Sequence, residues 1–380
     1  MVGSWADDKI LGFEDLKIVD NSAYFNYLIK PTTAVLLKSN EEGGKMKLAK
    51  VLLIFTIVLI MATAVFAAEK KKAKSVKEYE IVMVVKLEGV SWFDDMRKGI
   101  QKFDEDYADV KAYQVGHNTG DPAAQVALVE DLVAKGVDAI LVVPNDPKSL
   151  EPVFKKANER GILTFTHEAP SITNVSYDVE AFDNAAFGEN MMKILGKTMG
   201  GKGKYGAIVG LLTMDTHVAW ANAAVAYQKK NFPGMQLVTE PYIEDDNNQQ
   251  LAYQKVQELL KANPDLRGIL GCTGGSAPAA GLVIEERGLQ NKVAMSGLSL
   301  PSMAGTYLKK GVLQSIHFWS PADAGYVTAR VAYEVLKGKK ITNGMNLGRP
   351  GYEKVKVSGK IIMGAADITA TADNVDNWSF

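Results

Sequence analysis

This 380-residue sequence has a single cysteine and almost no net charge. Its one cysteine, Cys272, excludes an intrachain disulfide and any metal site built from several thiolates. Its 43 Lys and Arg residues are balanced by 44 Asp and Glu residues, which leaves a formal net charge of −1. A chain without a positive field does not attract polyanions, so we expect no nucleic-acid partner.

Histidine is scarce as well. The chain has four histidines, and no two of them have the spacing that presents two metal ligands on one helix face: His117, His167, His217 and His317. The sequence therefore predicts no metal site.

The signatures of a nucleotide cofactor and of a hydrolase are incomplete. The glycines of residues 196–206 imitate phosphate-binding loops, but they lead from a predicted helix into a predicted strand, the reverse of the order that such loops require. Ser276 and Ser299 each lack one of the two glycines that flank a nucleophilic serine at a sharp turn. We therefore expect no cofactor, and neither serine supports a hydrolase.

The chain has one long apolar run, near its beginning. Lys47 and Lys50 precede the uncharged segment 51–66, which ends in the small residues Ala67 and Ala68. The run is shorter than the ~20 apolar residues that a membrane-spanning helix needs, and it shows the three parts of a secretory signal peptide. We predict that this segment directs export and is cleaved, with a membrane anchor as the alternative.

The position of this signal divides the N-terminal part of the sequence. A signal peptide opens a chain, and Met46 would be an ordinary start, so we interpret residues 1–45 as a misassigned upstream extension and residues 46–67 as the signal peptide. Residues 68–78 contain five lysines and almost no apolar residue, and this composition predicts a solvated, charged tether.

From Tyr79 onward, short apolar runs alternate with longer segments of helical period, the pattern of parallel strands joined by helices. Two such series follow one another, which predicts two doubly wound α/β domains. Pro122 and Gly136 mark the two ends of one predicted helix. The predicted strands are 81–85, 110–115, 139–143 and 162–165 in the first series and 205–212, 237–243, 269–272 and 293–295 in the second, followed by a strand at 313–318 and a helix at 322–336.

Three histidines stand at or just after the carboxyl ends of predicted strands. His167 lies beside Glu168, His217 beside Asp215, and His317 near Trp319. In open α/β sheets the carboxyl ends of the strands form the edge at which ligands bind, so these residues are candidate ligand contacts. The alternative is that they are loop histidines bonded to solvent or backbone.

A lysine and two aromatic residues follow the first predicted strand. Lys86 ends the strand, and Trp92 and Phe93 precede or open the next helix. Aromatic faces stack on the C–H faces of sugars while charged side chains bind the hydroxyls, and this pair of residue types makes both contacts available. The alternative is that the aromatics pack on the core. We favour ligand contact for Trp92 and expect one of the two aromatics to be a core residue.

Several short motifs resemble, in their order and spacing, the type I periplasmic sugar-binding proteins of ABC importers, over residues 79–380. Within that family the sequence is most similar to the autoinducer-2 and rhamnose-type binding proteins. The motifs are Val85-Lys86-Leu87-Glu88-Gly89-Val90, Gly120-Asp121-Pro122 with Gln125, Ala277-Pro278-Ala279-Ala280, Gly297-Leu298-Ser299, Phe318-Trp319 and the closing Asn374-Val375-x-x-Trp378-x-Phe380.

The resemblance implies two domains joined by a three-stranded hinge, with the ligand in the cleft between them. The N-terminal domain would comprise residues 79–180 plus 321–350, and the C-terminal domain residues 181–320 plus 351–380. The three crossings would lie near residues 177–182, 317–322 and 351–359.

The resemblance also implies a set of ligand contacts. They are Lys86, Trp92, Phe93, Thr166, His167, Thr216, His217, Thr273 within the segment 272–274, Ser299 and Trp319, to which we add Asp215 beside His217. Only Lys86 keeps the autoinducer-2 pattern: Thr166 replaces its aspartate, Thr216-His217 its Asp-Gln pair, and Cys272-Thr273-Gly274 its Pro-Asp-Ala run. We therefore expect a different neutral sugar or polyol.

The function that these observations predict is that of a monomeric periplasmic solute-binding protein, without enzymatic activity, that delivers a sugar ligand to an ABC importer permease. A chemoreceptor is a second candidate partner, which would make the protein a sugar or autoinducer sensor. An exported sugar-acting enzyme, with His217 as base and Asp215 or Glu168 as its partner, is the alternative from another class. A lac-repressor-type regulator would need a DNA-binding helix-turn-helix where this chain has an export signal.

Overall fold

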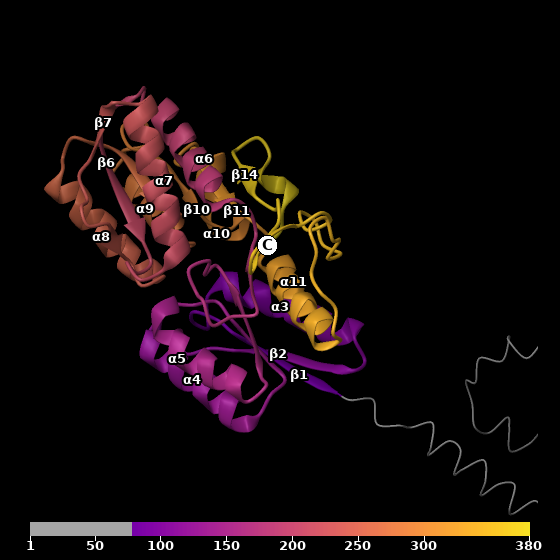
Figure 1. Cartoon of the computed structure of the whole chain (residues 1–380). Coiled ribbons are helices and arrows are strands. Elements are labelled where there is room, and N and C mark those ends of the chain that lie inside the picture. The colour runs from indigo at the N-terminus through magenta and orange to yellow at the C-terminus, as the bar shows by residue number, and fades with distance from the viewer. Residues whose placement is uncertain (1–77) are drawn as a thin grey trace, which may run out of the picture. The chain divides into compact units, whose positions relative to one another are not determined.

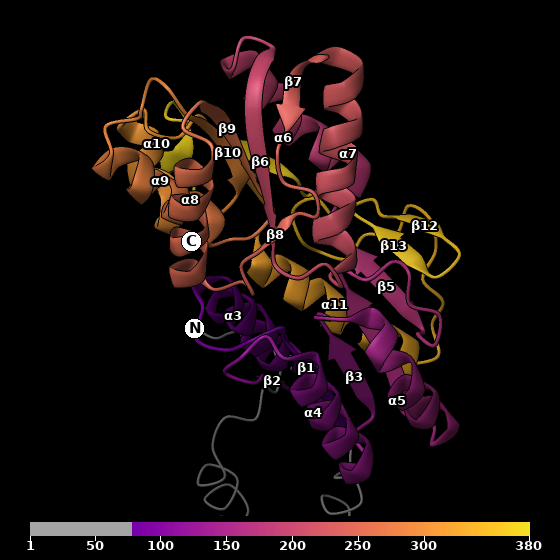
Figure 2. The ribbon, with the colours of Figure 1, turned by 90° about the vertical axis from the view of Figure 1, so that its left-hand side faces the viewer.

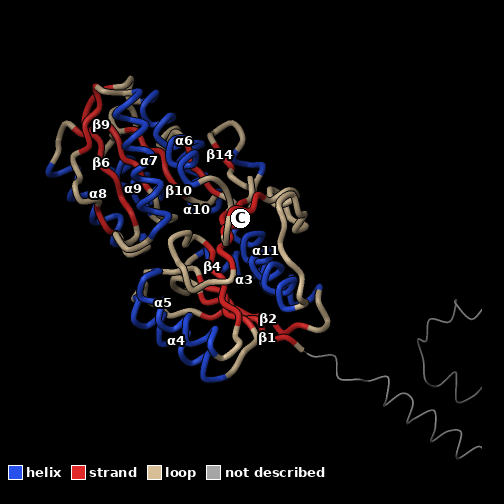
Figure 3. The backbone as a smooth tube through the Cα atoms, viewed as in Figure 1, coloured by secondary structure: helices blue, strands red, loops and turns tan. Residues whose placement is uncertain are grey.

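The computed structural model describes residues 78–380 (Figure 1). The predicted upstream extension, the signal peptide and all but the last residue of the tether lie outside these described residues. Within residues 78–380, no helix is both long and apolar enough to cross a membrane. Two α/β lobes make up this part of the chain, each with its strands enclosed by helices (Figure 3).

The first lobe contains a seven-stranded sheet with helices on both faces. Alternate residues of its first strand in the chain, β1 (Tyr79–Val84), enter separate hydrophobic clusters, Ile81 and Met83 on one face and Val82 and Val84 on the other. Helices α3 and α11 cover the first of these faces, and α4 and α5 cover the second. The strand order is β12 (Lys356–Ser358), β13 (Ile361–Met363), β5 (Tyr177–Glu180), β4 (Leu163–His167), β3 (Ala139–Val142), β1 (Tyr79–Val84), β2 (Val110–Val115); the helices are α3 (Ser91–Asp106), α4 (Pro122–Lys135), α5 (Pro147–Glu159) and α11 (Pro321–Leu336).

The second lobe repeats this architecture. Helices α6 and α7 pack together on one face of its sheet, and α8, α9 and α10 lie on the other (Figure 2). The strand order is β14 (Ile368–Ala370), β11 (Ser315–Phe318), β10 (Ala294–Leu298), β9 (Leu266–Gly271), β6 (Lys202–Val209), β7 (Gly234–Leu237), with β8 (Ile243–Glu244) also paired to β6; the helices are α6 (Asn184–Thr198), α7 (Asp215–Asn231), α8 (Gln249–Ala262), α9 (Ser276–Glu286), α10 (Pro301–Lys309) and the short 3₁₀ helix η1 (Val375–Asn377).

The predicted ends of helix α4 are confirmed, and both have local causes. Asp121 accepts a hydrogen bond from the Ala123 N–H, and Pro122 occupies the first helical position, where its missing N–H costs nothing. Gly136 ends the helix in the left-handed conformation, at φ +78°.

The chain crosses between the lobes three times. The first crossing, at residues 181–183, overlaps the predicted segment 177–182, the second, at 319–320, lies within 317–322, and α11 returns to the first lobe as expected. The third lies at residues 364–367, between β13 and β14. The predicted assignment of residues 351–380 to the second domain is therefore wrong for residues 351–363.

The physical reason is the pairing of β13, which continues the first sheet beside β5. Ile362 is paired with Val179 and is fully buried, so this strand completes a hydrophobic edge of the first lobe. Only β14 joins the second sheet. The predicted strand 237–243 is also wrong, since it is split into β7 and β8, with Pro241 and its missing N–H donor between them.

Each lobe contains one very close helix contact made possible by glycine. Gly99 of α3 lies so near α11 that a Cβ atom there would be 1.8 Å from the Ala322 carbonyl oxygen. Gly188 of α6 lies against α7, where a Cβ would be 2.2 Å from the Trp220 carbonyl oxygen. Any side chain at these positions forces backbone atoms apart, so the two glycines set how closely the helices pack.

We predict that Gly99→Ala lowers the free energy of unfolding by about 2 kcal/mol or more, because the added methyl group meets backbone that cannot move aside. Gly305→Ala in α10 is the matched control: its nearest neighbour is a Val375 methyl group at 3.2 Å, and alanine favours the helix, so we expect a change within about 1 kcal/mol. Urea unfolding followed by circular dichroism measures both. Equal stability of the two variants would contradict the close-packing argument.

Candidate functional site

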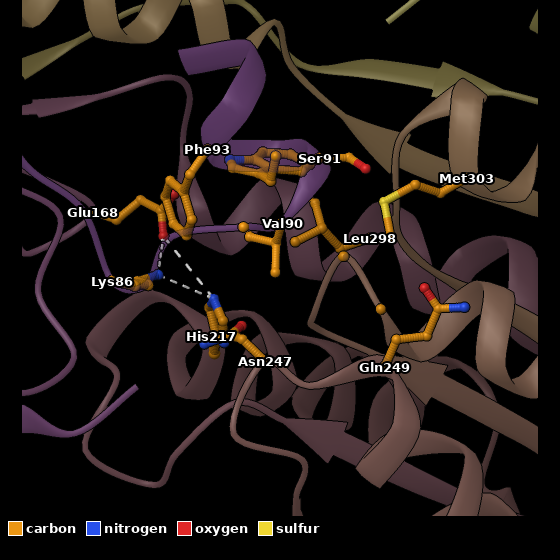
Figure 4. A pocket seen from close by; sticks show the side chains of 14 residues that line it. Lys86, Val90, Ser91, Phe93, Glu168, His217, Asn247, Gln249, Leu298 and Met303 are labelled. Atoms are coloured by element: carbon orange, nitrogen blue, oxygen red, sulfur yellow. Dashed lines mark hydrogen bonds and ion pairs between the residues drawn. The ribbon is translucent and has the colours of Figure 1, made fainter. Parts of the chain in front are cut away.

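A cavity of about 260 Å³ lies between the two lobes, at the carboxyl ends of their parallel strands. This is the edge at which open α/β sheets bind ligands. Figure 4 shows its lining, which is Lys86, Gly89, Val90, Ser91, Trp92, Phe93 and Glu168 from the first lobe and His217, Asn247, Gln249, Gly274, Gly275, Leu298 and Met303 from the second.

Three buried polar side chains meet at one end of this cavity. The Lys86 Nζ atom lies 2.5 Å from Glu168 Oε2 and 3.2 Å from His217 Nε2, so the cluster joins the two lobes (Figure 4). Lys86, Glu168 and His217 are 3%, 5% and 3% exposed. A buried ammonium and a buried carboxylate stabilise each other, because an unpaired buried charge is costly in free energy.

His217 is neutral in this setting. Burial, and secondarily the charge of Lys86, holds the pKa of its imidazole well below the ordinary value. The Gly210 N–H lies 3.2 Å from His217 Nδ1, and the Lys86 ammonium lies 3.2 Å from Nε2, so a donor faces each ring nitrogen. A neutral imidazole accepts at one nitrogen and donates at the other, so it accepts from only one of these two neighbours. The ammonium has three N–H donors, so Lys86 can contact Glu168 and His217 and still donate to a ligand oxygen.

The end of strand β1 is clamped so that Lys86 points into the cavity. The Gln125 side-chain amide donates to the carbonyl oxygens of Val85 and Val143, at 3.1 and 2.9 Å, and ties together the ends of β1 and β3. The Asn145 side chain donates to the Lys86 carbonyl at 2.8 Å. Glu168 reaches its lysine from a left-handed backbone conformation, φ +67°, directly after β4.

The aromatic residues form a second wall of the cavity. Trp92 and Phe93 both line it, and Trp92 packs edge-on against Trp319, with ring centroids 4.7 Å apart. Trp319 is 1% exposed and also contacts Phe182, so it supports Trp92 from behind rather than lining the cavity. Aromatic pairs of this geometry stabilise one another beyond their buried area.

Of the residues predicted to bind ligand, Lys86, Trp92, Phe93 and His217 line the cavity, and the others lie around it. Three buried hydroxyls have partners within their own lobe: Thr166 donates to Asp178 at 2.8 Å, Thr273 to Asp245 at 2.5 Å and Ser299 to the Gly274 carbonyl at 2.9 Å. His167 lies 2.6 Å, through Nδ1, from the Val179 carbonyl oxygen.

Two predicted residues contact the opposite lobe instead of the cavity. An Asp215 oxygen accepts from the Ser171 N–H at 3.2 Å, and the Thr216 hydroxyl lies 3.4 Å from Glu168 Oε2. Both stand in the first turn of α7. These contacts place both residues in the interface between the two lobes.

Asn247 and Gln249 are cavity residues that the sequence did not indicate. They follow β8, a strand of two residues, which leaves no apolar run to mark it. Asn248 between them is the N-cap of α8 and accepts from two backbone N–H groups. The sequence feature that could have indicated this loop is therefore Asn248, a residue type that favours the N-cap of a helix.

Asp245 anchors the loop that carries Asn247. It is fully buried, and its oxygens accept from the Thr273 hydroxyl at 2.5 Å and from the Asn247 N–H at 3.0 Å. Burial raises the pKa of this carboxyl to about 8. The proton that it retains lets it sit between β8 and β9 without a counter-ion.

We predict that Asp245 makes the protein less stable as the pH rises from about 4 to about 8. In this range the folded protein holds a proton that an unfolded aspartate, with a pKa of about 3.9, has released. Asp245→Asn removes this dependence. The free energy of unfolding of the variant, relative to that of the unchanged protein, should therefore be higher at pH 8 than at pH 5 by about 1 kcal/mol or more. Urea titrations at both pH values measure the difference. A constant difference would mean that the carboxyl is already ionised at pH 5.

Within the described part of the chain, no group of three or more His, Cys, Asp or Glu side chains is arranged to hold a metal ion.

Known proteins share this fold and sequence pattern. The chain is 24% identical over 297 residues to the ribose import binding protein RbsB of Bacillus subtilis. This match covers 76% of this chain and 93% of that protein. It superposes with a TM-score of 0.73 and 19% identity on LsrB from Clostridium saccharobutylicum in complex with AI-2, covering 79% of this chain and 100% of the other. For a solute-binding protein from Burkholderia graminis in complex with D-arabinose, the TM-score is 0.69 at 25% identity, covering 81% and 100%.

These matches confirm the predicted fold, two α/β domains of the type I periplasmic binding protein kind, and the predicted resemblance. The model of the periplasmic binding protein domain family matches residues 81–340, and the chain therefore belongs to that family.

Proposed function

We propose that this protein captures a small neutral sugar or polyol in the cavity between its lobes and delivers it to the permease of an ABC importer. The observation that carries the proposal is the buried cluster of Lys86, Glu168 and His217 beside the Trp92 wall. It offers donors for hydroxyls next to an aromatic surface for C–H faces. The names of the similar proteins, which refer to ribose and D-arabinose, support a sugar ligand.

The charges of the cavity support a neutral ligand. The Lys86 ammonium is balanced by the Glu168 carboxylate, and His217 is neutral, so the three groups carry no net charge. A charged ligand would bring an uncompensated charge into a buried site, at a large desolvation cost. The volume of about 260 Å³ lies below the ~300 to 1,000 Å³ of drug-sized sites and suits a single sugar ring.

Closure of the two lobes completes the capture. Besides the Lys86 to His217 contact, the Thr213 hydroxyl donates to the Asn145 carbonyl at 3.0 Å, and the Ser171 N–H donates to Asp215. These bonds join segments that only the three crossings connect covalently. A ligand that touches both lobes binds this joined state better than a separated one, and so shifts the equilibrium toward closure.

The remaining predicted features belong to the same proposal. The protein is exported, with cleavage near Ala68 or Glu69, and works as a monomer in the periplasm. Thr166, His167, Asp215, Thr216, Thr273, Ser299 and Trp319 support the ligand contacts from around the cavity. Delivery to the permease is the main use proposed, with a chemoreceptor as a second partner.

The alternative, an exported enzyme with His217 as base, finds less support in the geometry. An effective base is oriented by a third group, commonly a carboxylate on its far nitrogen. Here that nitrogen faces a backbone N–H instead of a carboxylate, and Asp215 is bonded to Ser171. This arrangement favours binding over catalysis, and a turnover assay on every sugar that binds separates the two.

Calorimetric titration with a panel of pentoses, hexoses and polyols tests the proposal. We expect Lys86→Met to weaken binding by about 1 kcal/mol or more, which is at least about fivefold, because the ligand loses a buried charged donor. Lys98→Met is the matched control, since Lys98 lies exposed on α3 and pairs with Asp95 outside the cavity. Unchanged affinity in Lys86→Met, with circular dichroism as in the unchanged protein, would remove Lys86 from the site.

Closure predicts a change of size on binding. X-ray scattering from the mature protein should give a smaller radius of gyration with saturating ligand than without it, because the ligand holds together lobes that three short crossings leave free to separate. Calorimetry on the same sample establishes saturation. A radius that does not change under those conditions would mean that the cleft is closed before the ligand arrives.

A further inference from the structure

The second lobe offers the cavity fewer hydroxyls than its sequence suggests. The Thr273 hydroxyl, after strand β9, donates to Asp245, and the Ser299 hydroxyl, after strand β10, donates to the Gly274 carbonyl. Both residues are fully buried. The one proton that each hydroxyl can donate is therefore used within the lobe, at strand ends where a donor to a sugar would be expected.

Apolar groups face the cavity in their place. Leu298 and Met303 line it from the second lobe and Val90 lines it from the first, while Gly274 contributes no side chain. Figure 4 shows Leu298 and Met303 on the opposite side of the cavity from Lys86 and Glu168, with Val90 between. We name Val90, Leu298 and Met303 the apolar end of the cavity. The cluster of Lys86, Glu168 and His217 is its polar end.

The polar side chains nearest the apolar end are not buried in it. Gln249 opens α8 and Ser91 opens α3, and both are exposed, so they remain hydrated at the mouth. A ligand hydroxyl placed against buried Leu298 and half-buried Met303 would exchange water for apolar side chains, which is unfavourable. A methyl group in that place would gain from being removed from water.

Resting on the proposed function, we propose that the ligand is a deoxy sugar or a methyl-bearing polyol, with its hydroxyls on the polar end and its methyl group on the apolar end. The polar end orients the ligand through charge-assisted hydrogen bonds. The apolar end then selects against ligands that carry a hydroxyl at the far carbon.

Sugars that differ in one hydroxyl test this directly. We use calorimetry on the mature protein with the pairs L-rhamnose and L-mannose, D-fucose and D-galactose, and L-fucose and L-galactose. In each pair that binds, the deoxy sugar should bind at least about tenfold more tightly. Met303→Gln, which places an amide at the apolar end, should reduce that ratio to below about threefold. Leu282→Gln on the exposed side of α9 is the matched control and should leave the ratio unchanged.

The outcomes separate this inference from the proposed function. Equal or tighter binding of the hydroxylated sugar in the pairs that bind overturns the apolar end while leaving sugar capture intact. An unchanged ratio in Met303→Gln overturns the role given to that wall. Absence of binding across these pairs and the wider panel of sugars and polyols overturns the proposed function, and the apolar end with it.

Discussion

The buried charge of Lys86 is the constraint on which the rest of the site depends. An ammonium that is 3% exposed must have a counter-charge and further hydrogen-bond partners, or the folded state would lose several kcal/mol. Glu168 supplies the charge from the next strand but one, in a left-handed backbone conformation that aims its side chain back toward β1. The Gln125 and Asn145 clamp holds the lysine backbone still. Together these contacts fix a pre-organised donor before any ligand arrives.

The charge of Lys86 also favours the neutral form of His217, the residue that the second lobe contributes to this cluster. His217 enters a space already occupied by an ammonium, so protonation of its ring would put two positive groups 3.2 Å apart in a dry site. The ring therefore stays neutral. The ammonium has three N–H donors, and its contacts with Glu168 and His217 leave one for a ligand oxygen. In the proposed function, this donor meets a hydroxyl oxygen of the sugar when the lobes close.

The sequence predicted the parts of this site that follow from strand ends and missed those that depend on tertiary hydrogen bonding. Lys86 was found because it comes just after strand β1, and His217 because it stands in the first turn of α7, the helix that follows strand β6. The hydroxyls of Thr273 and Ser299 stand at equivalent places, and nothing in one sequence tells which way a hydroxyl donates. Asn247 was not predicted because the strand before it has two residues, and so short a strand shows no alternation of apolar and polar residues.

In the proposed function, ligand binding acts on the three crossings between the lobes, and the arrangement of helices and crossings gives a physical reason. The paired helices of each lobe are in close backbone contact at Gly99 or at Gly188, whereas the crossings are segments of two to four residues. Trp319 occupies one of these crossings, directly after β11, and its ring packs on the Trp92 ring in the cavity wall. In the proposed function, a ligand that holds Trp92 in place also restrains the crossing that carries Trp319. The aromatic pair would then couple occupancy of the cavity to closure of the lobes.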